Sequence, residues 1–534
     1  MKKLRSLSLW ILVAVTMCLW VSAADYTWTA EDESYTLTFQ ENSDGTLTLS
    51  GYVSGTATDV DVVIPAEVEG KAVTVVGKEA FYKCAYTGTL TLPESLRSIK
   101  QYAFSTSQFT GDLVIPEGVT EIGDSAFSMC SSFQGTLTLP STVQTIGSSA
   151  FRYGGFTGSL VLPENLSVMG KGAFYACSNF TGDLVIPGSL KEVPAQAFYY
   201  CPKMEGTLTV SSGVESLGEE SFYNSGFSGE LQLPDTLKSI GKNAFMNRSK
   251  LTGTLTLKEG LTFIGENAFS GCTGLTGLQL PDSLTTIQGK AFYNCTGLSG
   301  ELVLPQNLEV LGYYAFGNCT GFTGHLTIPG SLKAIGANAF ASCKGFTGLA
   351  ISEGVEEIYE YAFNNCTGFT GTLEFPSTLK NIQRWAFSRC TGFTGDLILP
   401  EGLTSLSDRA FDGCSGLNGD LYVPGSLKEI PKQAFYQLRG ITGSITLGEG
   451  VEKIGEQAFY YCDQAAGTLT LPVSLKTVGN QAFQSCGKLT GDLNLPAGIS
   501  EIGANAFSYC SLLTGNLVIP ETVETLGSSA FSGC

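Results

Sequence analysis

Residues 135–151 read GTLTLPSTVQTIGSSAF, and this stretch decides the fold. Leu137 and Leu139 alternate with threonines, which is the period-two pattern of a short strand with leucine facing inward and threonine facing outward. Pro140 ends this strand because proline has no N–H group to donate to a strand ladder. The first half of the stretch therefore predicts one short, half-buried β-strand.

The second half of the stretch predicts a return into the core. Val143 and Ile146 lie three residues apart and indicate a second short segment, either extended or a helical turn. Gly147 allows a tight bend. Ala150 and Phe151 are apolar and follow directly, so we expect them to fill the end of the coil.

The Ala-Phe pair recurs along the chain, once as Ser-Phe, at intervals of 23 or 24 residues. A fixed period of this length is the signature of one short unit stacked into a solenoid. The sequence predicts a β-rich solenoid of about 20 coils with parallel strands, which offers surface rather than a deep catalytic pocket. The motif phenylalanines are Phe81, Phe104, Phe127, Phe151, Phe174, Phe198, Phe222, Phe245, Phe269, Phe292, Phe316, Phe340, Phe363, Phe387, Phe411, Phe435, Phe459, Phe483, Phe507 and Phe531.

The repeated phrase L-x-[LI]-P-x-x-[LV]-x-x-[IL]-G-x-x-A-F-x-x-C resembles that of the BspA-like leucine-rich repeats over about residues 60–534. The resemblance implies a leucine-rich-repeat stack and a surface or secreted protein of a host-associated bacterium or protist. It also implies kinship with adhesins that bind host matrix proteins or other cells. The chain departs from the pattern where Thr-Gly-Phe-Thr-Gly follows the cysteine, as at Thr320 to Gly324, and where four strands lack their proline. Those positions hold Ser211, Lys258, Ser352 and Gly448.

Residues 1–24 have the features of a secretory signal peptide. Three basic residues precede an apolar stretch from Leu7 to Val21, which is too short for a comfortable membrane span. Small residues then allow cleavage after Ala23 or Ala24. We expect a secreted or cell-surface protein, and a short transmembrane anchor is the alternative.

Residues 25–58 do not match the repeat and predict an N-terminal β-hairpin cap. Residues 35–39 and 46–49 alternate as strands do, and residues 42–45 between them are a turn signal. The Asp-Gly turn lacks the spaced acidic ligands of a calcium loop. The stack, residues 59–534, ends inside the repeat phrase without an expected cap. We expect either that the natural chain is longer or that something covers the last coil.

The composition is acidic, with 49 Asp and Glu against 30 Lys and Arg and a net charge of −19. Such a surface repels nucleic acid and anionic membranes. We therefore expect no nucleic-acid partner and no membrane insertion of the mature chain, and the surface could attract basic or cation-bridged partners.

Fifteen cysteines each stand three residues after a motif phenylalanine, outside Cys18 in the predicted signal. Disulfides are the usual expectation for an exported protein. Their number is odd, however, and equivalent side chains of stacked coils point the same way at about 4.8 Å, whereas a disulfide needs facing Cβ atoms about 3.8 Å apart. We therefore predict a ladder of reduced, buried thiols. One column of thiols also cannot surround a metal ion.

The sequence offers little chemistry for an enzyme. His325 is the single histidine, and it precedes Leu326 at a variable outward strand position. One histidine makes Ser-His or Cys-His catalysis improbable. Phosphate loops and singled-out carboxylate pairs are not seen, so we predict no enzyme activity, no cofactor and no metal.

Outward columns carry aromatic side chains that are candidates for recognition. One column follows the motif phenylalanine directly, and a second lies two residues before it, with Asn338 interrupting the second. Side by side, such rings could form a strip that binds a protein or a sugar with little loss of entropy. They could instead pack on adjoining turns and stiffen the edge. The candidates are Tyr175, Tyr199, Tyr223, Tyr314, Tyr361, Trp385, Tyr436 and Tyr460.

A basic column follows the leucine of the second segment and reads as solvated charge that discourages aggregation, or as a contact for an acidic partner. It holds Arg97, Lys191, Lys238, Lys333, Lys380, Lys428 and Lys476.

These features together predict an exported binding scaffold, a surface or secreted adhesin with multivalent, shallow contacts. Its partner is expected to be a host matrix protein or another cell-surface protein. The alternatives are a structural spacer or surface-layer repeat without a specific ligand, and a carbohydrate-binding module.

Overall fold

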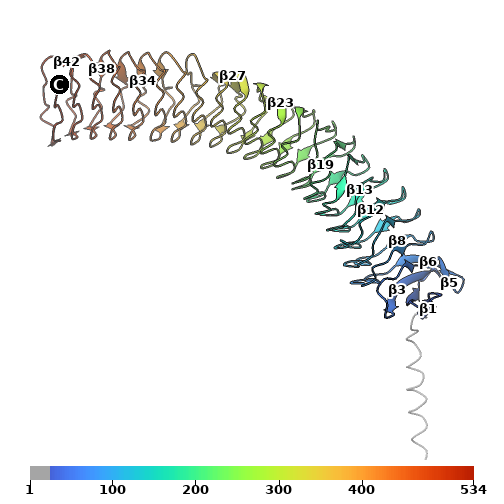
Figure 1. Cartoon of the computed structure of the whole chain (residues 1–534). Coiled ribbons are helices and arrows are strands. Elements are labelled where there is room, and N and C mark those ends of the chain that lie inside the picture. Colours follow the sequence, from blue (N-terminus) through green and yellow to red (C-terminus); the bar gives the residue numbers. More distant parts are fainter. Residues whose placement is uncertain (1–24) are drawn as a thin grey trace, which may run out of the picture. The chain divides into compact units, whose positions relative to one another are not determined.

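The structure is a computed structural model that describes residues 25–534, so the predicted signal peptide lies outside the described residues. The chain divides into two compact units, called unit 1 (up to Val214) and unit 2 (Glu215–Cys534). The described residues form short strands joined by turns, with no α-helix among them. Each unit is a stack of similar coils (Figure 1), which confirms the predicted solenoid.

Each coil carries up to three short strands, and equivalent strands of successive coils form two columns in each unit. The first column of unit 1 is β4 (Val62–Val63), β7 (Leu90–Thr91), β9 (Leu113–Val114), β11 (Leu137–Thr138), β13 (Gly158–Ser159), β15 (Phe180–Thr181), β16 (Leu184–Ile186) and β18 (Leu208–Val210). In unit 2 it is β21 (Gly253–Thr256), β23 (Leu275–Gln279), β25 (Gly300–Glu301), β27 (Phe322–Ile328), β29 (Phe346–Ile351), β32 (Leu397–Ile398), β34 (Leu421–Val423), β36 (Ile445–Leu447), β38 (Leu469–Thr470), β40 (Gly491–Asp492) and β42 (Leu513–Thr514).

The second column lies on the other arm of the coil. In unit 1 it is β6 (Lys71–Val76), β8 (Ser98–Ile99), β10 (Glu121–Ile122), β12 (Thr145–Ile146), β14 (Val168–Met169) and β17 (Glu192–Val193). In unit 2 it is β19 (Ser216–Leu217), β20 (Ser239–Ile240), β22 (Phe263–Ile264), β24 (Thr286–Ile287), β26 (Val310–Leu311), β28 (Ala334–Ile335), β30 (Glu357–Ile358), β31 (Asn381–Ile382), β33 (Ser405–Leu406), β35 (Glu429–Ile430), β37 (Lys453–Ile454), β39 (Thr477–Val478), β41 (Glu501–Ile502) and β43 (Thr525–Leu526).

Strands of the second column pair in parallel and in register. In unit 1, Ile122 lies opposite Ile99 on one side and Ile146 on the other. These isoleucines are fully buried, whereas the first residue of each strand faces outward. The alternation that the sequence predicts is thus confirmed, and the inward residues form a continuous aliphatic ladder.

Pairing in the first column is interrupted, and coil length explains one interruption. Only two residues separate Phe346 from Leu349, where three separate Phe322 from Leu326. Strand β29 therefore pairs with β27 through a register shift, since Gly324 lies opposite Phe346 but His325 opposite Gly348. The sheet β25-β27-β29 ends there, and the next sheet begins at β32.

The motif phenylalanines form a buried aromatic stack along each unit. Phe127 and Phe151 stack with ring centroids 5.5 Å apart and an interplanar angle of 1°. In unit 2, Phe483 and Phe507 stack at 5.3 Å and 6°. These four rings are fully buried, and each stabilises its coil by about 2–3 kcal/mol through removal of apolar surface from water. A coil buries this surface only against its neighbours, so the stack is cooperative.

The turn around each phenylalanine has a backbone that the sequence does not predict. The residues two before and two after the phenylalanine have a left-handed backbone conformation, as Tyr314 (φ 52°) and Asn318 (φ 61°) do around Phe316. The backbone amides of Tyr314, Phe316 and Asn318 donate to carbonyl oxygens of the next coil at 2.8, 2.8 and 2.7 Å. A left-handed residue other than glycine costs about 1 kcal/mol, and the three hydrogen bonds offset that cost.

Gly147 is required for a different reason from the bend that the sequence suggested. Its φ is not in the left-handed region. A Cβ atom at this position would instead overlap the backbone of Asp124 in the preceding coil. Glycine here permits close approach of two coils, and the same holds for Gly170 against Ser148.

The cysteines confirm the predicted burial with one exception. Fourteen of the fifteen free thiols are buried, and Cys534 is exposed. From Cys130 on, each thiol donates to the carbonyl oxygen of the preceding coil's motif phenylalanine, as Cys319 does to Phe292 at 3.0 Å. Burial raises the pKa of Cys177 to about 12, so this thiol is protonated at neutral pH.

Residues ahead of the first coil form antiparallel strands that pack onto it. Strands β2 (Tyr35–Glu41) and β3 (Leu47–Ser54) make the predicted hairpin, and β1 (Asp25–Thr29) adds a third strand that was not predicted. Strand β3 then pairs in parallel with β6, which also makes a hairpin with β5 (Glu67–Val68). Tyr52 stacks on Phe81 at 5.2 Å, so the aromatic stack continues into these strands.

Candidate functional site

In each unit the predicted aromatic candidates lie on the same edge of the coils, which we call the turn edge. It consists of the side chains three and two residues before, and one and two residues after, each motif phenylalanine. The turns described above place these side chains outside the phenylalanine stack. All eight candidates are half-buried, and none belongs to the core.

In unit 1 the turn edge carries a tyrosine and arginine cluster. Tyr175 and Tyr199 stack with centroids 4.7 Å apart and an interplanar angle of 3°. The guanidinium of Arg152 lies over two rings, 4.9 Å from the centroid of Tyr153 and 4.8 Å from that of Tyr175. A cation held between two aromatic rings is attracted by both ring faces.

Unit 2 carries a second cluster around Tyr314. Tyr293 meets Tyr314 edge-on at 5.4 Å, and Tyr313 meets it at 6.4 Å. The Lys290 ammonium lies 5.6 Å from the ring of Tyr313. Tyr313 donates its phenol O–H to Glu266, and this hydrogen bond raises the pKa of Tyr313. The phenol therefore stays protonated at neutral pH.

A three-layer stack stands farther along unit 2. Tyr361 and Trp385 stack at 4.9 Å with an interplanar angle of 16°. The guanidinium carbon of Arg384 lies 3.7 Å from the centroid of Trp385. Burial raises the pKa of Tyr361.

The last cluster continues into a ladder of amides. Tyr436 and Tyr460 stack at 5.4 Å and 11°, and the Arg409 guanidinium lies 5.3 Å from the ring of Tyr436. Arg409 donates to Gln433 at 2.7 Å, and Gln457 donates to the next glutamine of its column at 2.7 Å. Polar side chains of successive coils thus hold one another in place.

Within each unit the structure brings several of the candidates together as pairs. Tyr175 pairs with Tyr199, Tyr361 with Trp385, and Tyr436 with Tyr460, whereas Tyr314 contacts tyrosines outside the predicted set. Tyr223 belongs to unit 2 and so lies in a different unit from Tyr199. The sequence-based selection missed the cations because it considered aromatic side chains only. Arg152, Lys290 and Arg409 stand on the two columns that it followed, and Arg384 stands on an adjoining column.

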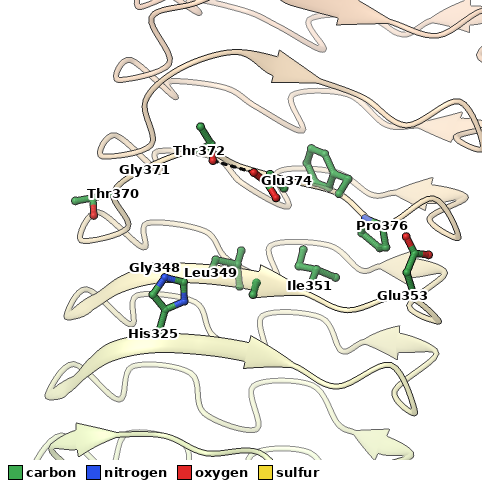
Figure 2. A pocket seen from close by; sticks show the side chains of 12 residues that line it. His325, Gly348, Leu349, Ile351, Glu353, Thr370, Gly371, Thr372, Glu374 and Pro376 are labelled. Carbon is green, nitrogen blue, oxygen red and sulfur yellow. Dashed lines mark hydrogen bonds between the residues drawn. The ribbon is translucent and has the colours of Figure 1, made fainter.

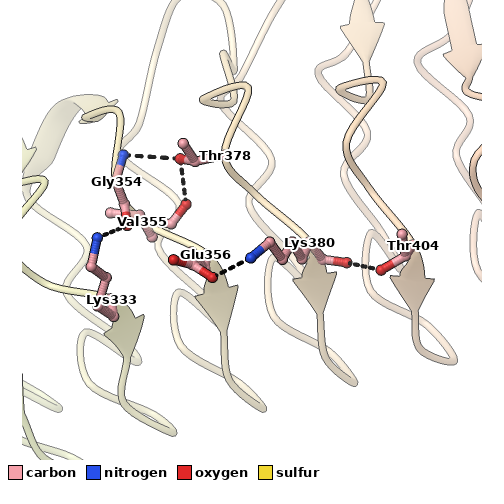
Figure 3. A network of polar contacts seen from close by, with 7 residues as sticks. All are labelled: Lys333, Gly354, Val355, Glu356, Thr378, Lys380 and Thr404. Carbon is pink, nitrogen blue, oxygen red and sulfur yellow. Dashed lines mark hydrogen bonds and ion pairs between the residues drawn. The ribbon is translucent and has the colours of Figure 1, made fainter.

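Three members of the predicted basic column, Lys238, Lys380 and Lys476, form ion pairs with glutamates. Lys380 Nζ lies 2.5 Å from Glu356 Oε2 of the preceding coil, and Lys476 pairs with Glu452 at the same distance. Figure 3 shows this arrangement and Lys333, which donates to the carbonyl of Gly354 at 3.3 Å. Exposed pairs of this kind contribute about 0–1 kcal/mol. The contacts favour solvated, mutually neutralised charge over a site for an acidic partner.

His325 borders a hollow of about 490 Å³ on the first strand column, where pairing stops after β29. Figure 2 shows the imidazole beside Gly348, and a Cβ at Gly348 would overlap it. Glu353 on the rim accepts hydrogen bonds from the amide and hydroxyl of Ser377, which lower its pKa. Glu374 accepts from a threonine hydroxyl at 3.2 Å. His325 is exposed, as predicted, and the hydrogen bonds to both carboxylates come from serine and threonine.

Residues 25–534 contain no group of three or more histidine, cysteine or acidic side chains placed to hold a metal ion. They also contain no helix that is long and apolar enough to cross a membrane.

The comparisons identify the family. The BspA type leucine-rich repeat region matches residues 74–205, 191–323, 322–442 and 429–534, so the chain belongs to this family. Proteins of this type are often surface proteins, and the repeat is typically a non-enzymatic scaffold. A search of curated proteins found no match.

Solved structures of similar fold include bacterial leucine-rich-repeat proteins. A leucine-rich repeat protein from Bacteroides ovatus is 24% identical, with 74% of this chain and 94% of that chain covered and a TM-score of 0.53. A leucine rich cell surface protein from Faecalibacterium prausnitzii is 23% identical, with 80% and 94% covered and a TM-score of 0.33. The likeness to the Bacteroides ovatus protein shows the fold alone.

Proposed function

We propose that this protein is an exported, cell-surface or secreted binding scaffold whose turn-edge clusters contact a protein partner. The proposal assigns residues 1–24 to a cleaved signal peptide, residues 25–58 to a cap and residues 59–534 to the binding stack. Leucine-rich-repeat proteins generally bind proteins, which supports this class of partner. The role is that of an adhesin.

One observation carries the proposal: half-buried aromatic side chains gather with arginines on the turn edge in clusters that are already ordered. Tyr361, Trp385 and Arg384 are the sharpest case, because each ring is fixed by the next layer. Tryptophan, tyrosine and arginine dominate the energetics of protein interfaces. Side chains held in place before binding lose less entropy on binding.

The same stacking argues against carbohydrate recognition at this cluster. A sugar ring packs on an open aromatic face, but Trp385 has one face on Tyr361 and a guanidinium over the ring. The edges and polar tips remain for contact, and these suit a protein surface.

The test is a binding screen of purified residues 25–534 against host matrix proteins, whole cells and polysaccharides. We expect saturable binding to one protein, weakened at least tenfold when Tyr361→Ala and Trp385→Ala are combined. Tyr509→Ala is the matched control, because Tyr509 is an exposed turn-edge tyrosine 60% accessible to solvent. An equal loss in the control, or selective retention of a polysaccharide, would contradict the proposal.

A structural spacer is the second candidate, because the side chains of the turn edge and the basic column contact one another from coil to coil. Arg409, Gln433 and the tyrosine pair at 436 and 460 illustrate this. The absence of saturable binding in the screen, together with concentration-dependent assembly in light scattering, would favour the spacer.

A further inference from the structure

The tyrosine and arginine cluster of unit 1 borders a second hollow whose lining is basic. Arg152, Lys171, Tyr175 and Gln196 enclose it together with the two serines Ser148 and Ser149, and its volume is about 450 Å³. Pockets of this size hold small ligands or single side-chain groups. Its lining contains two cations and no carboxylate, although the whole chain has a net charge of −19.

Arg152 is the unusual member of this lining. Its Nε atom is buried and has no hydrogen-bond acceptor. Among residues 25–534 its guanidinium makes no ion pair, and its contacts are the two ring faces of Tyr153 and Tyr175. Buried donors without an acceptor are rare in native proteins and call for a partner.

The carboxylate of Asp124, in the preceding coil, is already in use. Asp124 accepts the backbone amide of Ser148 at 2.7 Å and does not line the hollow. The Lys171 side chain is exposed and takes part in no ion pair of the described structure. Two cations therefore face the same space without a counter-ion from the chain itself.

We propose that this hollow binds a carboxylate side chain of the protein partner, with Arg152 as the principal donor. Arginine presents a planar fork of N–H donors that matches a carboxylate in a bidentate pair. The two tyrosine rings hold the guanidinium in place, Lys171 adds a second positive charge, and the hydroxyls of Ser148 and Ser149 supply further donors. The inference rests on the proposed protein-binding function and names an acidic segment as the chemistry recognised.

An acidic saccharide presents the same charge, but the aromatic lining disfavours it. Tyr175 is the ring that borders the hollow, and both of its faces are engaged, one by the Arg152 guanidinium and one by Tyr199. No open ring face is left in the lining for a sugar to pack on. The charge recognition therefore fits a flexible carboxylate side chain better than a sugar ring.

The test titrates residues 25–534 with fluorescently labelled hexaglutamate, with neutral hexaglutamine as the isosteric control, at ionic strengths from about 0.05 to 0.15 M. We expect saturable binding of hexaglutamate only, weakening as salt screens the charges. Arg152→Gln should weaken it at least tenfold. Lys171→Gln should weaken it about threefold while leaving the ring contacts of Arg152 intact, so it tests the site even where Arg152→Gln disturbs the fold.

Arg439→Gln is the matched control. Arg439 also lies over a tyrosine, 5.4 Å from the ring of Tyr461. The affinity of the Arg439→Gln variant for hexaglutamate should stay within twofold of that of the unmodified chain. The combined Tyr361→Ala and Trp385→Ala variant should also bind hexaglutamate normally, which separates this inference from the test of the proposed function. Equal affinity in the Arg152 and Lys171 variants, or tighter binding of a sulfated disaccharide than of hexaglutamate, would overturn the assignment.

Discussion

Replacing Phe316 by alanine tests the claim that the stacked phenylalanines hold the coils together. Phe316 is fully buried and stacks on Phe292 at 5.2 Å and on Phe340 at 5.8 Å. Truncating a buried phenylalanine costs about 3–5 kcal/mol, including the cavity that is left. About 4 kcal/mol changes the equilibrium for opening this part of unit 2 by roughly three orders of magnitude.

Tryptophan fluorescence during urea unfolding measures this effect. Trp28 and Trp385 are the two tryptophans of residues 25–534, so in a Trp28→Phe background the signal reports unit 2 alone. We expect Phe316→Ala to lower the urea midpoint by about 1 M or more, for a slope of roughly 3 kcal/mol per M.

The control is Phe263→Ala in the same unit. Phe263 lies on the outward face of β22 and is 37% exposed, so its loss should change the free energy of unfolding by about 0.5 kcal/mol or less. Equal shifts of the midpoint in the two variants would refute the reasoning, because the stack would then contribute no more than a surface ring.

Three further predictions follow from the contacts between coils. Burial raises the pKa of Cys177 and Cys343 from 9.0 to about 12. Because the thiols of the unfolded chain lose their protons at lower pH than those of the folded chain, the free energy of unfolding measured in urea should be full below pH 9 and fall as the pH rises from 9 to 12. A free energy of unfolding that stays constant up to pH 11 would contradict this. Gly348→Ala should displace the ring of His325, since the new Cβ would overlap it; the single histidine gives one set of imidazole NMR signals that should shift, while Gly498→Ala, whose Cβ would meet no atom closer than 3.8 Å, should leave them in place. Gln457→Ala removes two amide hydrogen bonds of the ladder and should cost about 1–2 kcal/mol, whereas Gln306→Ala on an exposed loop should cost less than about 0.5 kcal/mol; calorimetry that finds the two alike would show that the ladder adds no stability.

The repeat determines most of the fold because each apolar column can be buried only against the same column of the neighbouring coils. Leu137 and Phe151 must be covered by their counterparts in the next coil, so the period alone predicts the stack and its parallel strands. The left-handed turns were not predicted, because Tyr314 and Trp385 have no intrinsic preference for positive φ. Their conformation is imposed by hydrogen bonds to the neighbouring coil, which a single repeat does not reveal.

The candidate surface was predicted in part for a similar reason. Residues at the same column stack when they stand in adjacent coils, so spacing in the sequence finds pairs such as Tyr361 and Trp385. Arg384 belongs to an adjoining column, whereas Lys290 and Arg409 stand on a searched column but are not aromatic. Their contacts with the rings depend on how two columns adjoin in space. Arg152 was missed because it occupies the position directly after its phenylalanine, where the prediction considered only aromatic residues. The tyrosine of that coil, Tyr153, stands one residue later.

Within one coil, main-chain hydrogen bonds join successive turns, and this leaves the side chains of the turn edge available for binding a partner. The main chain supplies the three hydrogen bonds that join successive turns, as at Phe316, so the flanking side chains are not needed to hold the register. Within this one chain, the position two residues before the phenylalanine accordingly accepts chemically different side chains, including Glu79, Trp385, Arg409 and Gln457. The phenylalanine itself occurs in every coil. A backbone that tolerates any side chain at one edge can present a cationic cluster in unit 1 and an amide ladder in unit 2 without altering the coil that supports them.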